Sequence, residues 1–244
     1  MISKIKKYSI NYIFIIAFFS IFYLSNCRTN QAITESKNNL KTTTELLEII
    51  ASDNFEGREA GTNGYNKAAN YIENYITKLG VKPLFGNSFR DSVPLGENSS
   101  FNIVGVIPSA KHSKEYILLS AHLDHLGKQY NSEDSVYNGA NDNASGVVTL
   151  LKIAEKLTQT TCNKNIIIAF FTAEELGLYG SKNLAARIKA ENISLSYVLN
   201  IDMIGTALAN HPNSVYITGY EMSNLASTCN TILGKEFMIN HEID

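Results

Sequence analysis

The apolar residues in this 244-residue chain form continuous runs that alternate with segments of helical spacing. The runs predict strands at 102–107, 116–121, 165–172 and 195–203, with a further short strand at 215–218. Uninterrupted apolar strands separated by helices are typical of a largely parallel sheet that is covered on both faces. The length allows one full core. The pattern therefore predicts a single α/β domain, a three-layer α/β/α fold with a central, mostly parallel mixed sheet.

Helices are expected in the intervals between these strands. Segment 65–79 has apolar residues three or four positions apart, which is the spacing of one helix face, and Gly80 follows as a stop signal. Glycines in the segment 57–64 indicate a loop ahead of this helix. The other helices are expected at 43–51, 144–157, 176–189 and 221–233.

The amino terminus has the pattern of a targeting segment. Lysines in MISKIKK precede an apolar run at 12–24 that is short for a bilayer span, as in a signal peptide. The run ends in LSNC, which resembles a bacterial lipobox, although Asn26 stands where a small residue is usual. We expect a signal peptide at 1–26 and a lipid anchor on Cys27, which would place the protein in the bacterial cell envelope. An ordinary signal peptide or an uncleaved anchor are the alternatives.

The rest of the composition limits the domain organisation, the cysteine chemistry and the kinds of partner that we expect. Residues 27–42 are polar and predict a flexible tether ahead of a domain at 43–244. Cys162 and Cys229 could form a disulfide in an exported protein, or remain two free thiols. The formal charge of -2 and the scattered lysines give no basic face, so nucleic acid is not an expected partner.

Polar residues with metal-binding chemistry follow three of the expected strands. They are His122 with Asp124, Glu174 with Glu175, and Asp202. Because ligands of open α/β sheets collect beyond the carboxyl ends of the strands, we expect these side chains to meet in one crevice. Imidazole and carboxylate ligands without thiolate suit zinc, or less specifically cobalt or manganese.

Spacing indicates different roles within this set. His122 and Asp124 lie two positions apart, so on an extended backbone the carboxylate can orient the imidazole, and we expect His122 to be a ligand supported by Asp124. Asp142 lies in NGANDNASG, a loop that enters a helix, where it could bridge two cations or only cap the helix.

The adjacent acids Glu174 and Glu175 point in different directions. One of them could bind metal while the other moves a proton. The alternative is a pair that complements the dipole of the following helix. Asp202 ends an apolar strand, where its charge needs a partner, and a cation is the simplest one.

The chain resembles the co-catalytic zinc aminopeptidases of metallopeptidase family twenty-eight over residues 46–204. Four sequence motifs together carry this resemblance: AHLDHLG, NGANDNASG, TAEELGLYGS and NIDMIG. The resemblance implies a zinc-peptidase fold with two zinc ions and a peptide substrate, from which a metal-activated water releases N-terminal residues. It implies that His122 and Asp202 bind the first zinc and that Asp142 bridges. Glu175 would bind the second zinc, and Glu174 would be the general base.

One family feature is missing from the sequence. Members close the second zinc site with a downstream histidine, usually in a Ser-Asp-His word, and no such word occurs here. We therefore expect a C-terminally truncated chain in which one zinc is possible. His241 is a candidate substitute, whereas His211 has the sequence context of a surface turn.

Other functions on the same scaffold stay open. A catalytically inactive peptide-binding lipoprotein would tolerate the missing histidine. Carboxypeptidases share the same core motifs, so these motifs predict peptide hydrolysis but do not decide between the two ends of the peptide. A glutaminyl cyclase works with a single zinc, but retention of His122 disfavours it.

Overall fold

The computed structural model describes residues 40–129 and 133–240. From Thr43 onward, the described residues form one compact unit. The expected signal peptide at 1–26, Cys27 and most of the expected tether, together with His241, lie outside the described residues. Within the described part, no helix has both the length and the apolar character that crossing a bilayer requires.

The unit is built on a central sheet of six strands in the order β1-β3-β5-β4-β6, with β2 paired to β3. The strands are β1 (Lys82–Pro83), β2 (Arg90–Leu95), β3 (Asn98–Ile107), β4 (Glu115–His122), β5 (Asn165–Phe171) and β6 (Ser194–Asn200). Strands β5, β4 and β6 are parallel, and β3 runs antiparallel to β1, β2 and β5. The mixed sheet is as expected, but its parallel part is confined to the three strands that lead to the predicted site.

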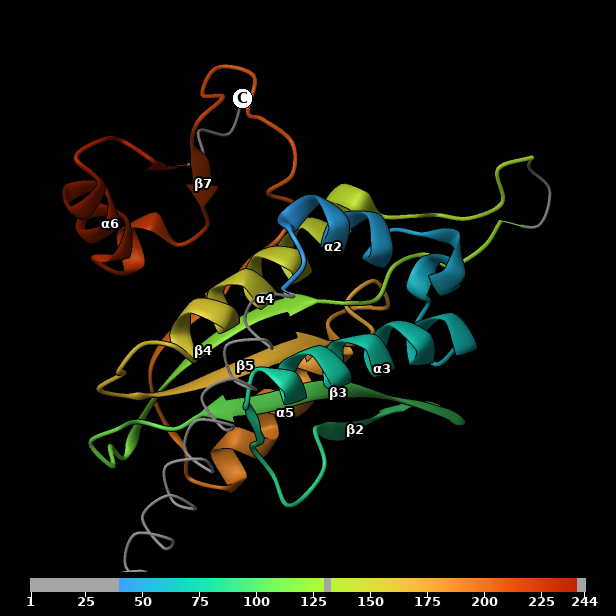
Figure 1. The fold of residues 1–244 in the computed structure, drawn as a ribbon, viewed down its shortest axis with the longest axis horizontal. Helices are drawn as coiled ribbons and strands as arrows, with labels where there is room; N and C mark the ends of the chain where they lie inside the picture. The colour runs from blue at the N-terminus through green and yellow to red at the C-terminus, as the bar shows by residue number, and fades with distance from the viewer. Residues whose placement is uncertain (1–39, 130–132, 241–244) are drawn as a thin grey trace, which may run out of the picture. The chain divides into compact units, whose positions relative to one another are not determined.

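Helices cover both faces of this sheet (Figure 1). One face packs against α2 (Thr43–Ile50), α3 (Asn63–Lys78) and α4 (Gly146–Leu157), and the other against α5 (Tyr179–Ala190). All seven residues of β5 are buried, because this central strand has helices on both sides. The predicted three-layer α/β/α architecture is confirmed.

The last described part of the chain forms a small substructure. Strands β7 (Val215–Ile217) and β8 (Met238–Asn240) pair in parallel. The helix expected at 221–233 is divided into a short 3-10 turn, Tyr220–Met222, and α6 (Leu225–Leu233), with Ser223 extended between them. Cys162 and Cys229 are both free thiols.

Element boundaries near the site differ from the sequence prediction. The strand expected at 195–203 ends at Asn200, so Asp202 lies in the following loop. The helix expected from residue 176 begins at Tyr179, which leaves Glu174 and Glu175 in a turn. The helix expected from residue 144 begins at Gly146, after an irregular turn over Ala140–Ser145. Each shift lengthens a loop beyond the sheet, and the site is made of these loops.

Candidate metal centre

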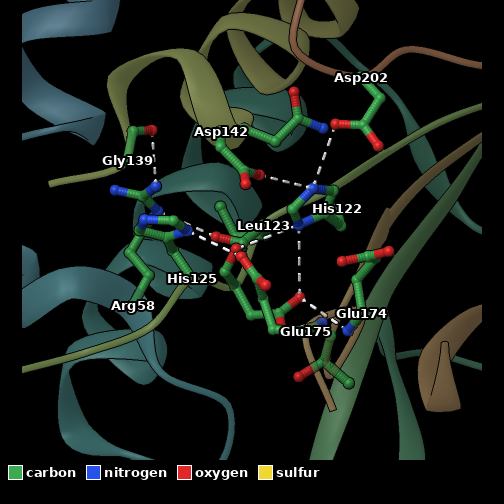
Figure 2. Close-up of polar contacts among 12 residues, drawn as sticks. Arg58, His122, Leu123, His125, Gly139, Asp142, Glu174, Glu175 and Asp202 are labelled. Atoms are coloured by element: carbon green, nitrogen blue, oxygen red, sulfur yellow. Dashed lines mark hydrogen bonds and ion pairs between the residues drawn. The ribbon is translucent and has the colours of Figure 1, made fainter. Parts of the chain in front are cut away.

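The predicted site residues meet beyond the carboxyl ends of the parallel strands (Figure 2). His122 is the last residue of β4, and Asp124 follows it. The turn after β5 carries the two glutamates, and the loops before α4 and after β6 supply one aspartate each. Three sets of potential ligand atoms result, each with its atoms within 4.8 Å of one another: His122, Asp142 and Asp202; His122, Glu174 and Glu175; His125, Asp142 and Glu175.

The first set has the spacing of a zinc site. Nε2 of His122 lies 3.1 Å from Oδ1 of Asp142 and 3.3 Å from Oδ1 of Asp202. Tetrahedral ligands at about 2.0 Å from zinc are about 3.3 Å apart. His122 is 1% exposed, and its Nε2 has no hydrogen-bond partner among the described residues. Two carboxylates converge on a buried imidazole nitrogen that makes no hydrogen bond, so a cation shared by these donors fits the residues present.

His122 contacts both the backbone and the carboxylate of Asp124. Nδ1 of His122 lies 3.1 Å from the backbone oxygen of Asp124, but 3.8 Å from Oδ1, which is beyond hydrogen-bond distance. The same carboxylate accepts hydrogen bonds from the backbone N–H groups of Glu174, at 3.1 Å, and Glu175, at 3.3 Å. Asp124 thus lies beside His122, as expected, and also connects the ends of β4 and β5.

The acidic surroundings set the charge of His122. Burial alone lowers the pKa of its imidazole, but the carboxylates of Asp124 and Asp202 outweigh that effect and raise the pKa to about 10. Without a cation the ring would therefore carry a proton at neutral pH. A metal must displace that proton, since only the neutral imidazole is a ligand.

Glu174 lies beside the ligands in a half-buried position. Burial raises the pKa of its carboxyl group, and the nearby negative charges of Asp202, Glu175 and Asp124 add to the rise, whereas His122 opposes it. A carboxylate whose pKa is moved toward neutrality is suited to accept and return a proton.

Two buried residues that hold the site together were not predicted from the sequence. Arg58 is 1% exposed and Asn143 is 1% exposed. Asn143 Nδ2 donates to the backbone oxygen of Ile201 at 2.9 Å, and its Oδ1 accepts from the N–H of Met203 at 3.2 Å. The loop that carries Asp142 is thereby tied to the loop that carries Asp202. Most of the partners of these two residues are backbone atoms far along the chain, which no local sequence pattern indicates.

His125 is a third residue that the sequence reasoning missed. Its Nδ1 lies 2.8 Å from Oε1 of Glu175. The available signal was the spacing His-x-x-His within AHLDHLG. His211, in contrast, lies in an exposed turn and belongs to none of the ligand sets, as its sequence context predicted.

Comparison with known proteins decides the family. Residues 102–235 match the model of peptidase family M28, which is more than half of the chain. The chain belongs to peptidase family M28. A probable leucine aminopeptidase of Trichophyton verrucosum is 28% identical over 189 residues, covering 73% of this chain and 46% of that relative. This M28 chain thus spans less than half the length of the curated relative.

Solved structures share the fold of this M28 chain. The Legionella pneumophila LapA aminopeptidase superposes with a TM-score of 0.63 at 23% identity, over 87% of this chain and 57% of that chain. A glutaminyl cyclase of Bacteroides thetaiotaomicron superposes with a TM-score of 0.59 at 21% identity, over 82% and 74%. At these identities the likeness concerns the architecture alone.

Proposed function

We propose that this chain is a zinc-dependent exopeptidase that releases N-terminal residues from peptides. The observation that carries the proposal is the buried, unpartnered Nε2 of His122, which faces two carboxylates while Glu174 lies at the same cluster. Membership of family M28 and the named aminopeptidases among its relatives support the same reaction.

The roles follow from the donor atoms. His122, Asp142 and Asp202 would hold one zinc ion. Zinc, when bound, lowers the pKa of a water ligand and polarises a carbonyl oxygen. Glu174 would take a proton from the attacking water and pass it to the leaving amine. Its carboxylate lies close to His122 and Glu175, and its raised pKa suits a group that accepts and returns a proton.

The surroundings favour an amino-terminal substrate group with an apolar side chain. The excess of carboxylates at the site would attract a protonated α-amine. Large apolar side chains are also exposed on the loops that carry the ligands and at the start of α5; they are Leu126, Leu176, Leu178, Tyr179, Met203 and Ile204. Such exposed apolar groups beside a polar site are a typical contact surface for an apolar residue.

Assay of the full-length chain with added zinc tests the proposal. We expect hydrolysis of leucyl amide, loss of activity with a chelator, and no hydrolysis of N-acetyl-leucyl amide, because acetylation removes the amine. Release of the last residue from an N-acetylated peptide would instead indicate a carboxypeptidase. Cyclisation of a peptide with N-terminal glutamine would indicate a cyclase, and no reaction by the zinc-loaded chain would favour a binding protein.

We also propose that the protein is exported and anchored in the cell envelope through a lipid on Cys27. The basic start, short apolar run and LSNC word support this. Expression in a bacterium with labelled palmitate tests it: the chain should incorporate label, and Cys27→Ala should abolish incorporation. Equal labelling of the two proteins would refute the anchor.

A further inference from the structure

We propose that Asn102 is a positioning residue for the general base: its side-chain amide joins the two ends of the loop 172–180 and thereby holds Glu174 in place. The proposal rests on the proposed function, because it gives Asn102 a part in the same reaction. Asn102 lies on β3, and its side chain is buried, with 0% of the residue exposed.

The loop 172–180 leads from β5 to α5 and carries both glutamates of the site. Its ends are close together, because the N–H of Gly180 donates to the backbone oxygen of Thr172 at 3.1 Å. Two residues between these ends, Ala173 and Leu178, have left-handed backbones, with φ of 52° and 63°. Non-glycine residues seldom adopt this conformation, and they keep it only where the surrounding structure determines it. The loop therefore needs contacts that maintain its shape.

Asn102 provides such a contact at each end of the loop. Its Oδ1 accepts a hydrogen bond from the N–H of Thr172 at 3.1 Å, and its Nδ2 donates one to the backbone oxygen of Gly180 at 3.0 Å. The approach is close, since a Cβ at Gly180 would lie 2.4 Å from Oδ1 of Asn102. These two hydrogen bonds form an amide clamp, in which one buried side chain pairs with a main-chain donor and a main-chain acceptor.

A carboxylate fixes the orientation of this amide. Nδ2 of Asn102 donates to Oδ2 of Asp91 at 3.2 Å, and Asp91 is 3% exposed. Asp91 is itself held by α5, because Nη1 of Arg187 donates to its Oδ1 at 2.5 Å and Nδ2 of Asn183 to its Oδ2 at 3.3 Å. A carboxylate paired with arginine only accepts hydrogen bonds, so the NH₂ group of Asn102 must face it. This orientation leaves Oδ1 free for the N–H of Thr172.

The amide clamp acts on Glu174 through a short stretch of main chain. Thr172 lies two positions before Glu174, whose N–H donates to Oδ1 of Asp124 at 3.1 Å. The turn is thus tied to β3 through Asn102 and to the end of β4 through Asp124. A general base must stay within hydrogen-bond reach of the water that it deprotonates, and a misplacement of about 1 Å can cost about 10²-fold in rate. Loss of the amide clamp should therefore lower kcat.

A purely structural contact is the competing account. In that account Asn102 stabilises the sheet and has no bearing on Glu174. Asn165 is a matched control, because it is a buried asparagine at the start of β5, the end of the strand opposite to the site. Its Oδ1 accepts from the N–H of Ser109 at 2.9 Å, and its Nδ2 donates to the backbone oxygen of Ser113 at 2.7 Å. Asn165→Ala therefore removes the same kind of contact without touching the loop 172–180.

Amide hydrogen exchange of the full-length chain, followed by mass spectrometry with and without zinc, tests the clamp itself. In Asn102→Ala we expect the segment 172–180 to exchange about 10-fold faster than in the unmodified chain. In Asn165→Ala this segment should exchange as in the unmodified chain. If Asn102→Ala does not fold, Asp91→Asn takes its place with a smaller increase expected, since it keeps the amide but removes the carboxylate that orients it.

Kinetics with leucyl amide test whether the clamp acts through Glu174. We expect Asn102→Ala to lower kcat about 10- to 100-fold with KM and zinc content unchanged, and Asn165→Ala to keep kcat within about 2-fold. In a Glu174→Gln background, Asn102→Ala should lower the residual kcat by less than about 2-fold, because a base that is absent cannot be misplaced.

Three results would overturn the proposal. Unchanged exchange of the segment 172–180 in Asn102→Ala would show that the amide does not hold the loop. Faster exchange with unchanged kcat would make Asn102 a structural residue only. An equal loss of kcat with and without Glu174 would mean that Asn102 acts through another group. Any of these in an active chain leaves the proposed function standing, whereas an unmodified zinc-loaded chain that does not hydrolyse leucyl amide refutes the proposed function and the positioning role with it.

Discussion

Nε of Arg58 donates a hydrogen bond to the backbone oxygen of Leu123, the residue after His122, at 3.0 Å. The same guanidinium donates to the backbone oxygens of Ile50, Asn138 and Gly139, at 2.8, 2.7 and 3.0 Å. Burial lowers the pKa of Arg58 to about 10, so the group remains charged at neutral pH. One buried cation thus joins the end of α2, the end of β4 and the loop that leads to Asp142.

Replacement of Arg58 should destabilise the fold and loosen the site together. Arg58→Met leaves four buried or half-buried carbonyl groups without their donor, which we expect to cost about 3 kcal/mol of unfolding free energy. Urea unfolding measures this. Arg90→Met is the control, because Arg90 forms an exposed ion pair with Glu73 and should cost less than about 1 kcal/mol. Equal costs for the two variants would contradict the role given to Arg58.

Replacement of Asn143 should weaken the binding of the cation. Its side chain joins the loops of Asp142 and Asp202, so Asn143→Ala lets the two ligands separate. We expect zinc affinity to fall about 10- to 100-fold, as is usual for groups that support metal ligands. Competition with a chromophoric chelator gives the affinity. Asn213→Ala, in an exposed turn, should leave it unchanged, and a similar loss in both variants would contradict the prediction.

The sequence predicted those parts of the fold in which the burial pattern is regular. Strand β5 reads as a continuous apolar run because it is buried throughout. Strand β2 was missed, since one of its inward positions is Asp91, whose charge is paired with Arg187 at the far end of α5. A buried aspartate at such a position breaks the apolar alternation by which a half-buried strand is recognised.

Most of the predicted site residues follow a strand directly, whereas Asp142 was predicted from its place in a loop that enters a helix. His122 could be found from its place after an apolar run, and Glu174 and Glu175 likewise. His125 contacts Glu175 across 50 residues of chain, and Asn143 contacts Ile201 across 58. The spacing His-x-x-His in AHLDHLG marks His125 as a candidate, but contacts of this kind depend on the tertiary fold, so only the structure shows the partners of both residues.

Gly139 should tolerate no side chain. Its φ is 56°, in the left-handed region, and a Cβ there would lie 2.1 Å from the backbone oxygen of Asp142. Gly139→Ala should therefore cost about 3 kcal/mol from strain and overpacking together. Gly86 is a matched control with a φ of 59° and no atom within 4 Å of the position that a Cβ would take, so Gly86→Ala should cost only about 1 kcal/mol. Urea unfolding of both variants measures the two costs. Equal costs would mean that the left-handed φ alone matters and that the close approach of the Asp142 backbone does not.

Glu174→Gln should remove activity without removing the cation. Glutamine has nearly the same shape but cannot accept a proton from water, so we expect kcat for leucyl amide to fall about 10²- to 10⁴-fold. Zinc content and the unfolding midpoint should stay as in the unmodified chain. Glu191→Gln, on the exposed end of α5, should retain full activity. Loss of zinc in Glu174→Gln would instead show that Glu174 is a ligand.

Removal of zinc should destabilise the protein by an amount that depends on the free zinc concentration. The carboxylates of Asp142, Asp202, Glu174 and Glu175 converge on His122, and without a cation their charges repel one another. At free zinc 100-fold above the dissociation constant, binding adds about 2.7 kcal/mol to the unfolding free energy, provided that the unfolded chain does not bind zinc.

Urea unfolding with zinc or with excess chelator measures this difference. Asp202→Asn should reduce it because a ligand is lost, whereas Asp134→Asn, at an exposed position, should preserve it. Equal unfolding midpoints with zinc and with chelator would mean that these carboxylates do not form a metal site.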